Sequence, residues 1–160
     1  MILSDQKIKE LMEKGVLRID EFDDNNLTPN GYDLTIDEVV VKERRPQKEG
    51  ETVIPANTWF AVSTREYVKL PPDIAAELWI RTTWARQGVI SSFGMIDAGF
   101  EGTLTLSAYN SYKELEIPIG DSFAQMCFHL LSENSDKAYS ERSGNYQGQE
   151  GVTLEKKKKG

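Results

Sequence analysis

The sequence predicts an all-β domain, either a distorted β-barrel or a jelly-roll-like sandwich, with one short helix at its N-terminus. Short runs of alternating or β-branched apolar residues recur along most of the chain. Clusters of Gly, Pro and Asn separate these runs and are typical turn formers. Only the first residues show the spacing of an amphipathic helix. Many short strands with frequent turns are typical of barrels and sandwiches.

The N-terminal helix is predicted from one capped amphipathic stretch. Ser4 is a favourable N-cap residue, and Gly15 is a favourable C-terminal stop. Between them, Ile8, Leu11 and Met12 share one helical face. The stretch is polar, unlike the apolar segment of a secretory signal peptide.

Strands are predicted along the rest of the chain. The expected ranges are 16–19, 32–36, 39–41, 52–54, 59–64, 67–70, 76–80, 103–109, 115–119 and 123–131. The clearest alternation lies at 103–109, where Leu104, Leu106 and Ala108 share one face. We expect this apolar face to be buried.

The charge and the residue types exclude several classes of protein. The 160 residues carry a formal net charge of −7. Binding of polymeric nucleic acid requires many phosphates to be neutralised, so an acidic chain is a poor candidate for it. No apolar run approaches the roughly 20 residues of a membrane span. A single Cys excludes an intrachain disulfide and fits a reducing, cytoplasmic location.

The composition divides the chain into two parts. Residues 1–131 carry the strand pattern and are expected to form the β domain. Residues 132–160 are rich in Ser, Asn, Gly, Gln and charge, with few apolar anchors. We expect this second part to be a flexible C-terminal arm that orders over a ligand or over a neighbouring subunit.

The segment 81–88, RTTWARQG, combines cations and hydroxyl groups in one turn. Thr82 or Thr83 can cap a single helical turn, whose free N–H groups attract anions. Arg81 and Arg86 add guanidinium groups, which suit phosphate oxygens. The functional interpretation is a phosphate-binding turn, and the alternative is a capped turn with two surface arginines.

The segment 94–102, GMIDAGFEG, places one carboxylate in a glycine-bounded turn. Asp97 lies between two apolar residues, where its carboxylate can act on a water as a general base. Phe100 offers an apolar surface that favours a deoxyribose over a more hydroxylated sugar. An Asp that only hydrogen-bonds its own turn is the alternative interpretation.

Two further polar residues lie on predicted strands. Asp33 follows the turn at 29–31 and can hold a water or a metal-bound water, but taken alone the segment is more typical of a plain turn that enters a strand. Gln125 lies in an apolar strand and needs a buried partner. Structural pairing and contact with a ligand both satisfy that need.

The arm contains a polar, Gly-rich run at 142–149, RSGNYQGQ. Arg142 and the backbone of this run can contact phosphates, and Tyr146 can stack on a base. Such a run would then form a lid. A disordered tail is the alternative interpretation of the same composition.

In their order along the chain, these motifs resemble the dUTPase and dCTP deaminase superfamily, particularly its archaeal members. The matching segments are GYDL at 31–34, RTTWARQG at 81–88, GMIDAGFEG at 94–102, the strand residue Gln125 and NYQGQ at 145–149. The opening MILSDQKIKELMEKG resembles the first helix of the deaminase branch. The resemblance implies a dUTPase-like β-clip fold and a homotrimer with active sites between subunits.

The resemblance also implies a catalytic centre. Asp97 matches the carboxylate that activates the water attacking the α-phosphorus, and Phe100 matches the aromatic ring under the deoxyribose. Asp33 matches the first-motif Asp, which supports the site or the hydrated metal. Mg²⁺ is expected as cofactor, held mainly by the triphosphate and with no direct protein ligand.

The remaining substrate contacts are implied in the same way. Thr82, Thr83 and Arg86 match the phosphate-binding turn, next to Arg81, and Gln125 matches the strand Gln that contacts the phosphates. The backbone around Ser92, Phe93 and Gly94 would read the base edge. Gly148 and Gln149 match the arm that closes over the triphosphate, whereas Arg142 and Tyr146 are candidates from the composition of the arm, with Tyr146 where the family would have a Phe.

One position departs from the deaminase branch. That branch carries a Glu on the strand where this chain has Ser107, and the Glu handles the nucleophilic water and the proton transfers at the cytosine ring. A Ser hydroxyl cannot do a carboxylate's proton work. The departure argues against deamination and leaves hydrolysis at Asp97 unaffected.

Together these observations predict a dUTP diphosphatase that converts dUTP and water to dUMP and pyrophosphate. Two alternatives fit the same residues. One is a dCTP deaminase, alone or combined with dUTPase activity. The other is a non-catalytic member of the superfamily that binds a nucleotide.

Overall fold

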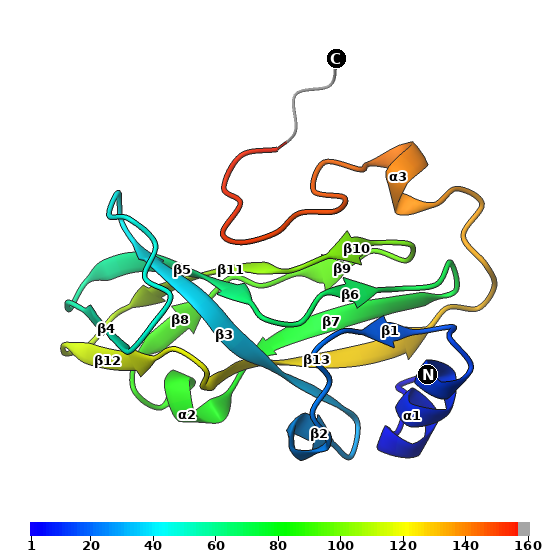
Figure 1. Ribbon diagram of the computed structural model, residues 1–160, viewed down its shortest axis with the longest axis horizontal. Helices are drawn as coiled ribbons and strands as arrows, with labels where there is room; N and C mark the ends of the chain where they lie inside the picture. The colour runs from blue at the N-terminus through cyan, green and yellow to red at the C-terminus, as the bar shows by residue number, and fades with distance from the viewer. Residues whose placement is uncertain (157–160) are drawn as a thin grey trace.

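A computed structural model describes residues 1–156 of the chain, and residues 157–160, the end of the predicted arm, lie outside this description. The fold is mostly antiparallel strand, curled into a half-barrel (Figure 1). The strands are β1 Arg18–Ile19, β2 Leu27–Thr28, β3 Gly31–Val41, β4 Glu51–Ile54, β5 Thr58–Thr64, β6 Val68–Lys69, β7 Ile74–Ile80, β8 Val89–Ser91, β9 Met95–Ile96, β10 Glu101–Gly102, β11 Thr105–Asn110, β12 Leu115–Pro118 and β13 Ser122–Leu130.

The largest sheet follows the order β8–β11–β5–β3–β13–β7–β9, with β2 added beside β3. Smaller sheets of order β1–β6–β10 and β12–β4 complete the curve. The predicted all-β class with a distorted, dUTPase-like barrel is therefore confirmed. None of the helices within residues 1–156 is long and apolar enough to cross a membrane.

The helices are α1 Asp5–Glu13, the 3-10 turn η1 Asp24–Asn26, and the single turns α2 Thr82–Ala85 and α3 Tyr139–Arg142. The structure confirms the expected α1, in which the Ser4 hydroxyl accepts a hydrogen bond from the backbone N–H of Lys7. Ile8 is fully buried and anchors this helix against the sheet.

Strand β3 joins two predicted strands into one. The ranges 32–36 and 39–41 form a single element, with a register shift between Ile36 and Glu38. Such an irregularity interrupts the alternation of side chains, which made one bent strand look like two. The shift leaves Glu38 buried at 4% exposure.

The core lies inside the curl of the large sheet. The prediction for 103–109 is confirmed, because Leu104, Leu106 and Ala108 are all buried. On β13 the alternation puts Ala124, Met126 and Phe128 in the core. The intervening side chains of this strand point to the other face of the sheet.

Residues 132–156 run back from β13 over the opposite side of the molecule (Figure 1). After α3 the chain passes over the β9–β10 region, and Gln149 forms a parallel bridge with Gly102. The extended stretch 149–153 therefore lies along the edge formed by β10 and β11. This course positions the arm next to Asp97.

Candidate functional site

Asp97 lies in the turn between β9 and β10. Its neighbours Ile96 and Phe100 are each 5% exposed and fix the turn to the core, whereas Asp97 itself is exposed. The backbone N–H of Phe100 donates to the carbonyl of Asp97 at 3.1 Å. The turn is thus closed by backbone atoms, and the Asp97 side chain has no ion-pair or hydrogen-bond partner within residues 1–156.

A hollow of about 280 Å³ opens beside this carboxylate. Its walls come from the Asp97 turn, from β11 and from the arm. The lining residues are Leu78, Gly94, Met95, Ile96, Asp97, Phe100, Leu104, Thr105, Leu106, Tyr139, Ser143, Asn145, Tyr146 and Gln149. The structure therefore brings together four predicted site groups: Gly94, Asp97, Phe100 and the arm residues Tyr146 and Gln149.

Tyr139 connects the arm to the Asp97 turn. Its ring meets Phe100 edge-on, with 5.6 Å between the ring centroids and 71° between the planes. The Tyr139 hydroxyl accepts a hydrogen bond from the backbone N–H of Tyr146 at 3.2 Å. Tyr139 thus packs on Phe100, the candidate contact for the deoxyribose, and positions Tyr146, the candidate stacking residue.

The next part of the arm pairs with β10. The N–H of Gly148 donates to the Glu101 carbonyl at 2.7 Å, and the N–H of Thr103 donates to the Gln149 carbonyl at 2.9 Å. A Cβ at Gly102 would lie 3.0 Å from the Gln149 nitrogen, and Gly102 has a φ of +147°. The second glycine of the GFEG segment is therefore required for the arm to approach this closely.

Ser107 lies in an adjoining hollow on β11. This hollow shares Thr105, Tyr146 and Gln149 with the Asp97 hollow, and its other lining residues are Trp59, Ser107, Thr153 and Leu154. The Ser107 hydroxyl makes no hydrogen bond within residues 1–156. Among the described residues that line the two hollows, Asp97 is the only carboxylate.

The phosphate-turn candidates lie on α2, which is fixed by a tryptophan. Trp84 is 6% exposed, donates from Nε1 to the Ser122 carbonyl at 2.8 Å and packs at a tilt against Phe123. With Trp84 buried, Thr82, Thr83 and Arg86 are left exposed. The prediction that Thr82 or Thr83 caps the turn is wrong: both lie inside α2, and Arg81 occupies the N-cap position without a side-chain hydrogen bond.

Asp33, Arg81 and Gln125 gather beside this turn on the outer face of the large sheet. Arg81 Nη1 lies 2.5 Å from Asp33 Oδ2, and Gln125 is opposite Asp33 in the strand register. Burial raises the pKa of the Asp33 carboxyl, and the Arg81 charge acts in the opposite direction. Gln125 Nε2 donates to Thr28 Oγ1 at 2.8 Å. Thr28 thus supplies the hydrogen-bond partner that a polar side chain in this apolar strand needs.

The two halves of the predicted site lie apart within one chain. Strand β9 pairs with β7 at Ala76 and Glu77, whereas Arg81 lies just beyond the other end of β7. Arg81 is five residues beyond Ala76, so at about 3.3 Å per residue it lies roughly 16 Å from that point. Asp97 and the α2 turn therefore do not face one hollow in a single chain.

The segment 92–94 lies between these halves. Phe93 packs against Phe123, with 6.1 Å between the ring centroids, which leaves Ser92 and Gly94 exposed. Phe93 and Gly94 line a third hollow together with Trp79 and Met95. Gly94 and Met95 line the Asp97 hollow too, so the two hollows adjoin along β9.

Arg142 lies away from the Asp97 hollow. Its guanidinium is exposed and lies 3.9 Å from the Asp136 carboxylate, a loose ion pair within the arm. The sequence interpretation also missed two residues that the structure places in the hollow, Tyr139 and Thr105. An aromatic residue in a polar arm was the available signal for Tyr139, whereas nothing in the local sequence marks Thr105.

The residue types beside the candidate site offer few ligands for a metal ion. Within residues 1–156 no group of three or more His, Cys, Asp and Glu side chains is arranged to hold a metal ion. Asp33 is already paired with Arg81, and Asp97 stands alone. The described residues therefore do not fit a protein-ligated metal centre.

Comparison with known proteins gives consistent matches. The family model described as dCTP deaminase-like matches residues 37–131. A dCTP deaminase of Pyrococcus furiosus is 39% identical over 163 residues, which cover 99% of this chain and 99% of that protein. A probable deoxyuridine 5′-triphosphate nucleotidohydrolase of Sulfolobus islandicus rod-shaped virus 1 is 36% identical and covers 98% and 99% of the two chains.

Solved structures share the fold at low sequence identity. A 2′-deoxycytidine 5′-triphosphate deaminase of Agrobacterium tumefaciens superposes with a TM-score of 0.71 at 18% identity, over 81% of this chain and 47% of that chain. A dUTPase from phage phi11 of S. aureus, described with a structural Mg(II) ion, has a TM-score of 0.53 at 18% identity, over 76% and 94%.

These matches agree with the order of motifs and with the curled sheet. The family-model match spans more than half of the chain, and the curated relatives match it over almost its whole length. The relatives include enzymes named for two reactions, the deamination of dCTP and the hydrolysis of dUTP. The chain belongs to the dCTP deaminase-like family, within the superfamily of dCTP deaminases and dUTPases.

Proposed function

We propose that this family member is a dUTP diphosphatase, which hydrolyses dUTP to dUMP and pyrophosphate. The observation that carries the proposal is that Asp97 is the only carboxylate among the described residues lining the two adjoining hollows. In the deaminase branch a Glu would occupy the position of Ser107. Without that Glu, the site retains one carboxylate, in the position suited to activating a water for attack on phosphorus.

In the proposed reaction Asp97 accepts a proton from a water molecule. The water oxygen forms a bond to the α-phosphorus, the bond from that phosphorus to the bridging oxygen of the β-phosphate breaks, and pyrophosphate leaves. Phe100 packs under the deoxyribose. Exposed Thr82, Thr83 and Arg86, with Gln125 nearby, stabilise the negative charge on the phosphoryl oxygens.

Mg²⁺ enters this proposal as part of the substrate. Because residues 1–156 hold no three-ligand cluster, the triphosphate oxygens would be its main ligands. The ion would neutralise part of the charge of the triphosphate, which an acidic protein otherwise repels.

A homotrimer with sites between subunits is proposed from the separation of the two halves. Trp79 and Met95 are 57% and 55% exposed on the face that joins them. Large exposed apolar side chains on one face are typical of protein interfaces. A second copy against this face would bring its α2 turn towards Asp97 of the first.

The substrate assay separates the two activities of the family. The protein is incubated with Mg²⁺ and either dUTP or dCTP, and both pyrophosphate and ammonia are measured. We expect pyrophosphate from dUTP and no ammonia from dCTP. Asp97→Asn should reduce the hydrolysis at least 100-fold while leaving the fold intact, because its amide cannot accept the proton. Near wild-type hydrolysis by this variant would remove the central claim.

Deamination of dCTP is the second candidate, because the curated relatives include several enzymes named dCTP deaminase. It requires a group other than a carboxylate at position 107 to move the protons. Ammonia released from dCTP by the wild-type protein would establish this activity in place of, or in addition to, the first.

A further inference from the structure

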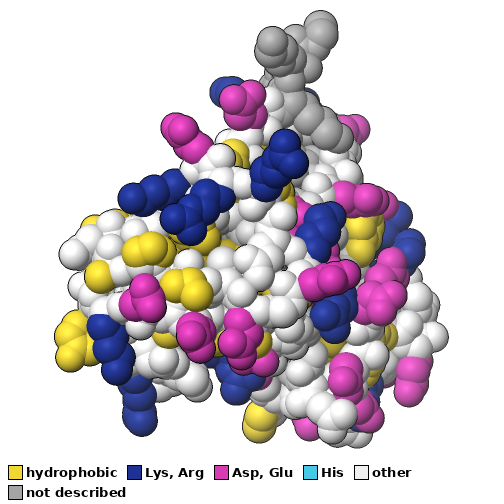
Figure 2. Space-filling model, turned by 60° about the vertical axis from the view of Figure 1, so that its left-hand side comes forward, with side chains coloured by type: hydrophobic (Ala, Val, Ile, Leu, Met, Phe, Trp, Pro, Cys, Tyr) yellow, Lys and Arg dark blue, Asp and Glu magenta, His cyan; other side chains and the backbone are white. Residues whose placement is uncertain are grey.

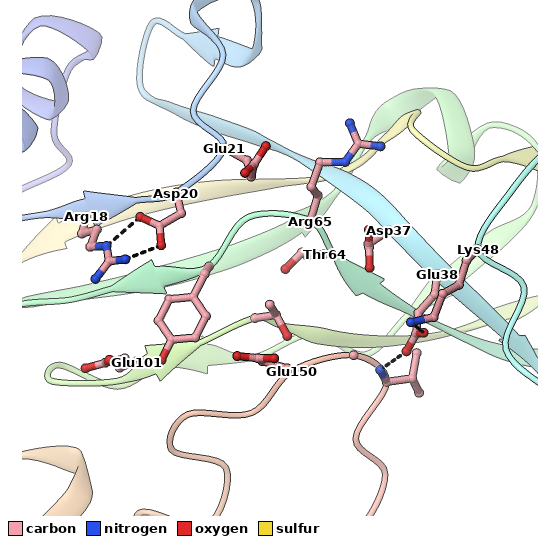
Figure 3. Close-up of a pocket in the computed structure, with 14 residues that line it drawn as sticks. Arg18, Asp20, Glu21, Asp37, Glu38, Lys48, Thr64, Arg65, Glu101 and Glu150 are labelled. Atoms are coloured by element: carbon pink, nitrogen blue, oxygen red, sulfur yellow. Dashed lines mark hydrogen bonds and ion pairs between the residues drawn. The ribbon is translucent and has the colours of Figure 1, made fainter.

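Glu38 lies in a polar cleft that the proposed reaction does not use. The cleft has a volume of about 810 Å³ and is bordered by β1, β3 and the arm residues 150–152. Several of its charged side chains pair with each other, such as Arg18 with Asp20 and Lys48 with Glu38 (Figure 3). Acidic and basic side chains are likewise interspersed on the molecular face in Figure 2.

The carboxylate of Glu38 binds the backbone of the arm. The side chain is buried, and Oε1 accepts a hydrogen bond from the backbone N–H of Val152. The other oxygen lies 3.3 Å from Lys48 Nζ. Figure 3 shows both contacts as dashed lines. A buried charge needs such partners, so removing the arm would leave Glu38 incompletely paired.

The arm has a matching shape at this point. Gly151 has a φ of +65°, and a Cβ there would lie 2.8 Å from Glu38 Oε1. A side chain would therefore both strain the backbone and collide with the carboxylate. From β11, Thr105 Oγ1 donates to the Gly151 carbonyl at 3.3 Å and accepts from the Thr153 N–H at 2.9 Å. Glu38 and Thr105 together hold residues 151–153, which we call the latch.

The latch lies just beyond the part of the arm that lines the Asp97 hollow. Before it, Gln149 pairs with Thr103, and Tyr146 is held by Tyr139, which packs on Phe100. Each of these partners belongs to the same chain as Asp97. With the latch closed, the arm is fixed at its far end as well as over the hollow.

We propose that Glu38 is a positioning residue of the arm, and that the latch directs each arm onto Asp97 of its own subunit. The kinetic test of this inference rests on the proposed hydrolysis of dUTP, whereas the proteolysis test does not. It assigns the Asp97 turn and the arm to one subunit and leaves the α2 turn, with Arg81 and Gln125 beside it, to come from a neighbour.

Proteolysis tests the latch without any substrate. Glu38→Ala removes the acceptor, whereas Glu38→Gln keeps an oxygen that can accept from Val152. Tryptic cleavage after exposed Arg142, followed by mass spectrometry, should be about tenfold faster in Glu38→Ala and less affected in Glu38→Gln. Asp37→Asn is the matched control, since Asp37 lines the same cleft and has no partner within residues 1–156. Equal cleavage rates in Glu38→Ala and Asp37→Asn would contradict the proposal that Glu38 holds the latch.

Kinetics distinguish positioning from a general structural effect. We expect Glu38→Ala to raise the KM for dUTP about tenfold while kcat changes less than twofold, because the arm then closes less often on bound substrate. Gly151→Ala should do the same from the arm side. The double variant should be no worse than the more affected single variant, since both changes open one latch. Additive losses would show that Glu38 acts elsewhere.

Mixed oligomers test which subunit the arm serves. One chain carries Asp97→Asn with a normal arm, and the other carries Tyr146→Ala and Gln149→Ala with a normal Asp97. If each arm serves its own Asp97, no site in the refolded mixture is complete, and activity should not exceed the average of the two parents. A clear gain in activity would overturn the proposal. If the wild-type protein does not hydrolyse dUTP, the proposed function fails while the proteolysis result still decides the latch.

Discussion

The Arg81 guanidinium reaches across β13 and lies 2.5 Å from the carboxylate of Asp33 on β3. Asp33 is 8% exposed, and its burial raises the pKa of the carboxyl. Arg81 stabilises the charged form in this environment and also occupies the N-cap position of α2. The ion pair thus fixes the position at which the phosphate turn leaves the sheet.

Replacing this arginine should make stability depend on pH. In Arg81→Met the pKa of Asp33 should rise further, because the opposite charge is lost. A carboxyl with a raised folded-state pKa stabilises the fold below its unfolded pKa, and this contribution is lost as pH rises through the folded pKa. Urea unfolding should therefore show a loss of about 1–3 kcal/mol at pH 7. The loss should shrink as the pH falls through the raised folded-state pKa and disappear below the unfolded pKa of about 3.9. A loss independent of pH would argue against the pairing.

Arg86 should affect phosphate binding and leave stability unchanged. It is exposed on α2 and has no ion-pair partner within residues 1–156. Arg86→Met should raise the KM for dUTP at least tenfold, because charge-assisted contacts to phosphate are lost. Arg45→Met, an exposed arginine in the loop after β3, is the matched control and should have no effect.

Mixing variants should also reveal a site shared between subunits. Neither Asp97→Asn nor Arg86→Met should be fully active alone, and a refolded mixture should exceed the average of the two parents. One neighbour would then supply Arg86 to an intact Asp97. Absence of any gain would place both residues of each site in one chain, contrary to their separation along β7.

Tyr139→Phe isolates one hydrogen bond of the arm. The ring contact with Phe100 is kept, but the acceptor for the Tyr146 N–H is lost. Losing this hydrogen bond should weaken the binding of dUTP by about 1 kcal/mol, which corresponds to a roughly fivefold higher KM. Tyr139→Ala should raise the KM further, because it removes the ring as well. Equal KM values for the two variants would show that the hydroxyl contributes nothing.

Ser107→Ala should keep dUTP hydrolysis within about twofold of wild type. The hydroxyl makes no hydrogen bond within residues 1–156, and the proposed chemistry does not use it. Initial rates of pyrophosphate release at saturating and at low dUTP test this directly. A tenfold or larger loss, about 1.4 kcal/mol, would show that Ser107 contacts the substrate or the water.

Removal of Mg²⁺ should abolish turnover without affecting the free protein. EDTA is expected to lower dUTP hydrolysis at least 100-fold, and excess Mg²⁺ should restore it, because the ion is bound mainly by the triphosphate. The melting temperature without nucleotide should be the same with and without EDTA. A lower melting temperature in EDTA would indicate a metal site in the protein itself.

The sequence predicted the fold class because long alternating strands and one capped helix carry strong periodicity. The strand containing Leu104, Leu106 and Ala108 is an example. Strands β9 and β10 contain two residues each, too few to show a period, and they were predicted only as turns. The sequence marks the bend at Glu38 only as a break between two strands, because a register shift depends on the partner strand.

For the candidate site, the sequence by itself determined which residue types were available: a lone Asp in a glycine-bounded turn, a turn with two arginines, and Ser107 on the strand between them and the arm. Only the tertiary structure decided their grouping. It placed Tyr139 and Gln149 with Asp97, Arg81 with Asp33, and Glu38 with Val152. These contacts join residues far apart in the chain, and their geometry depends on strand pairing and burial, which no local pattern encodes.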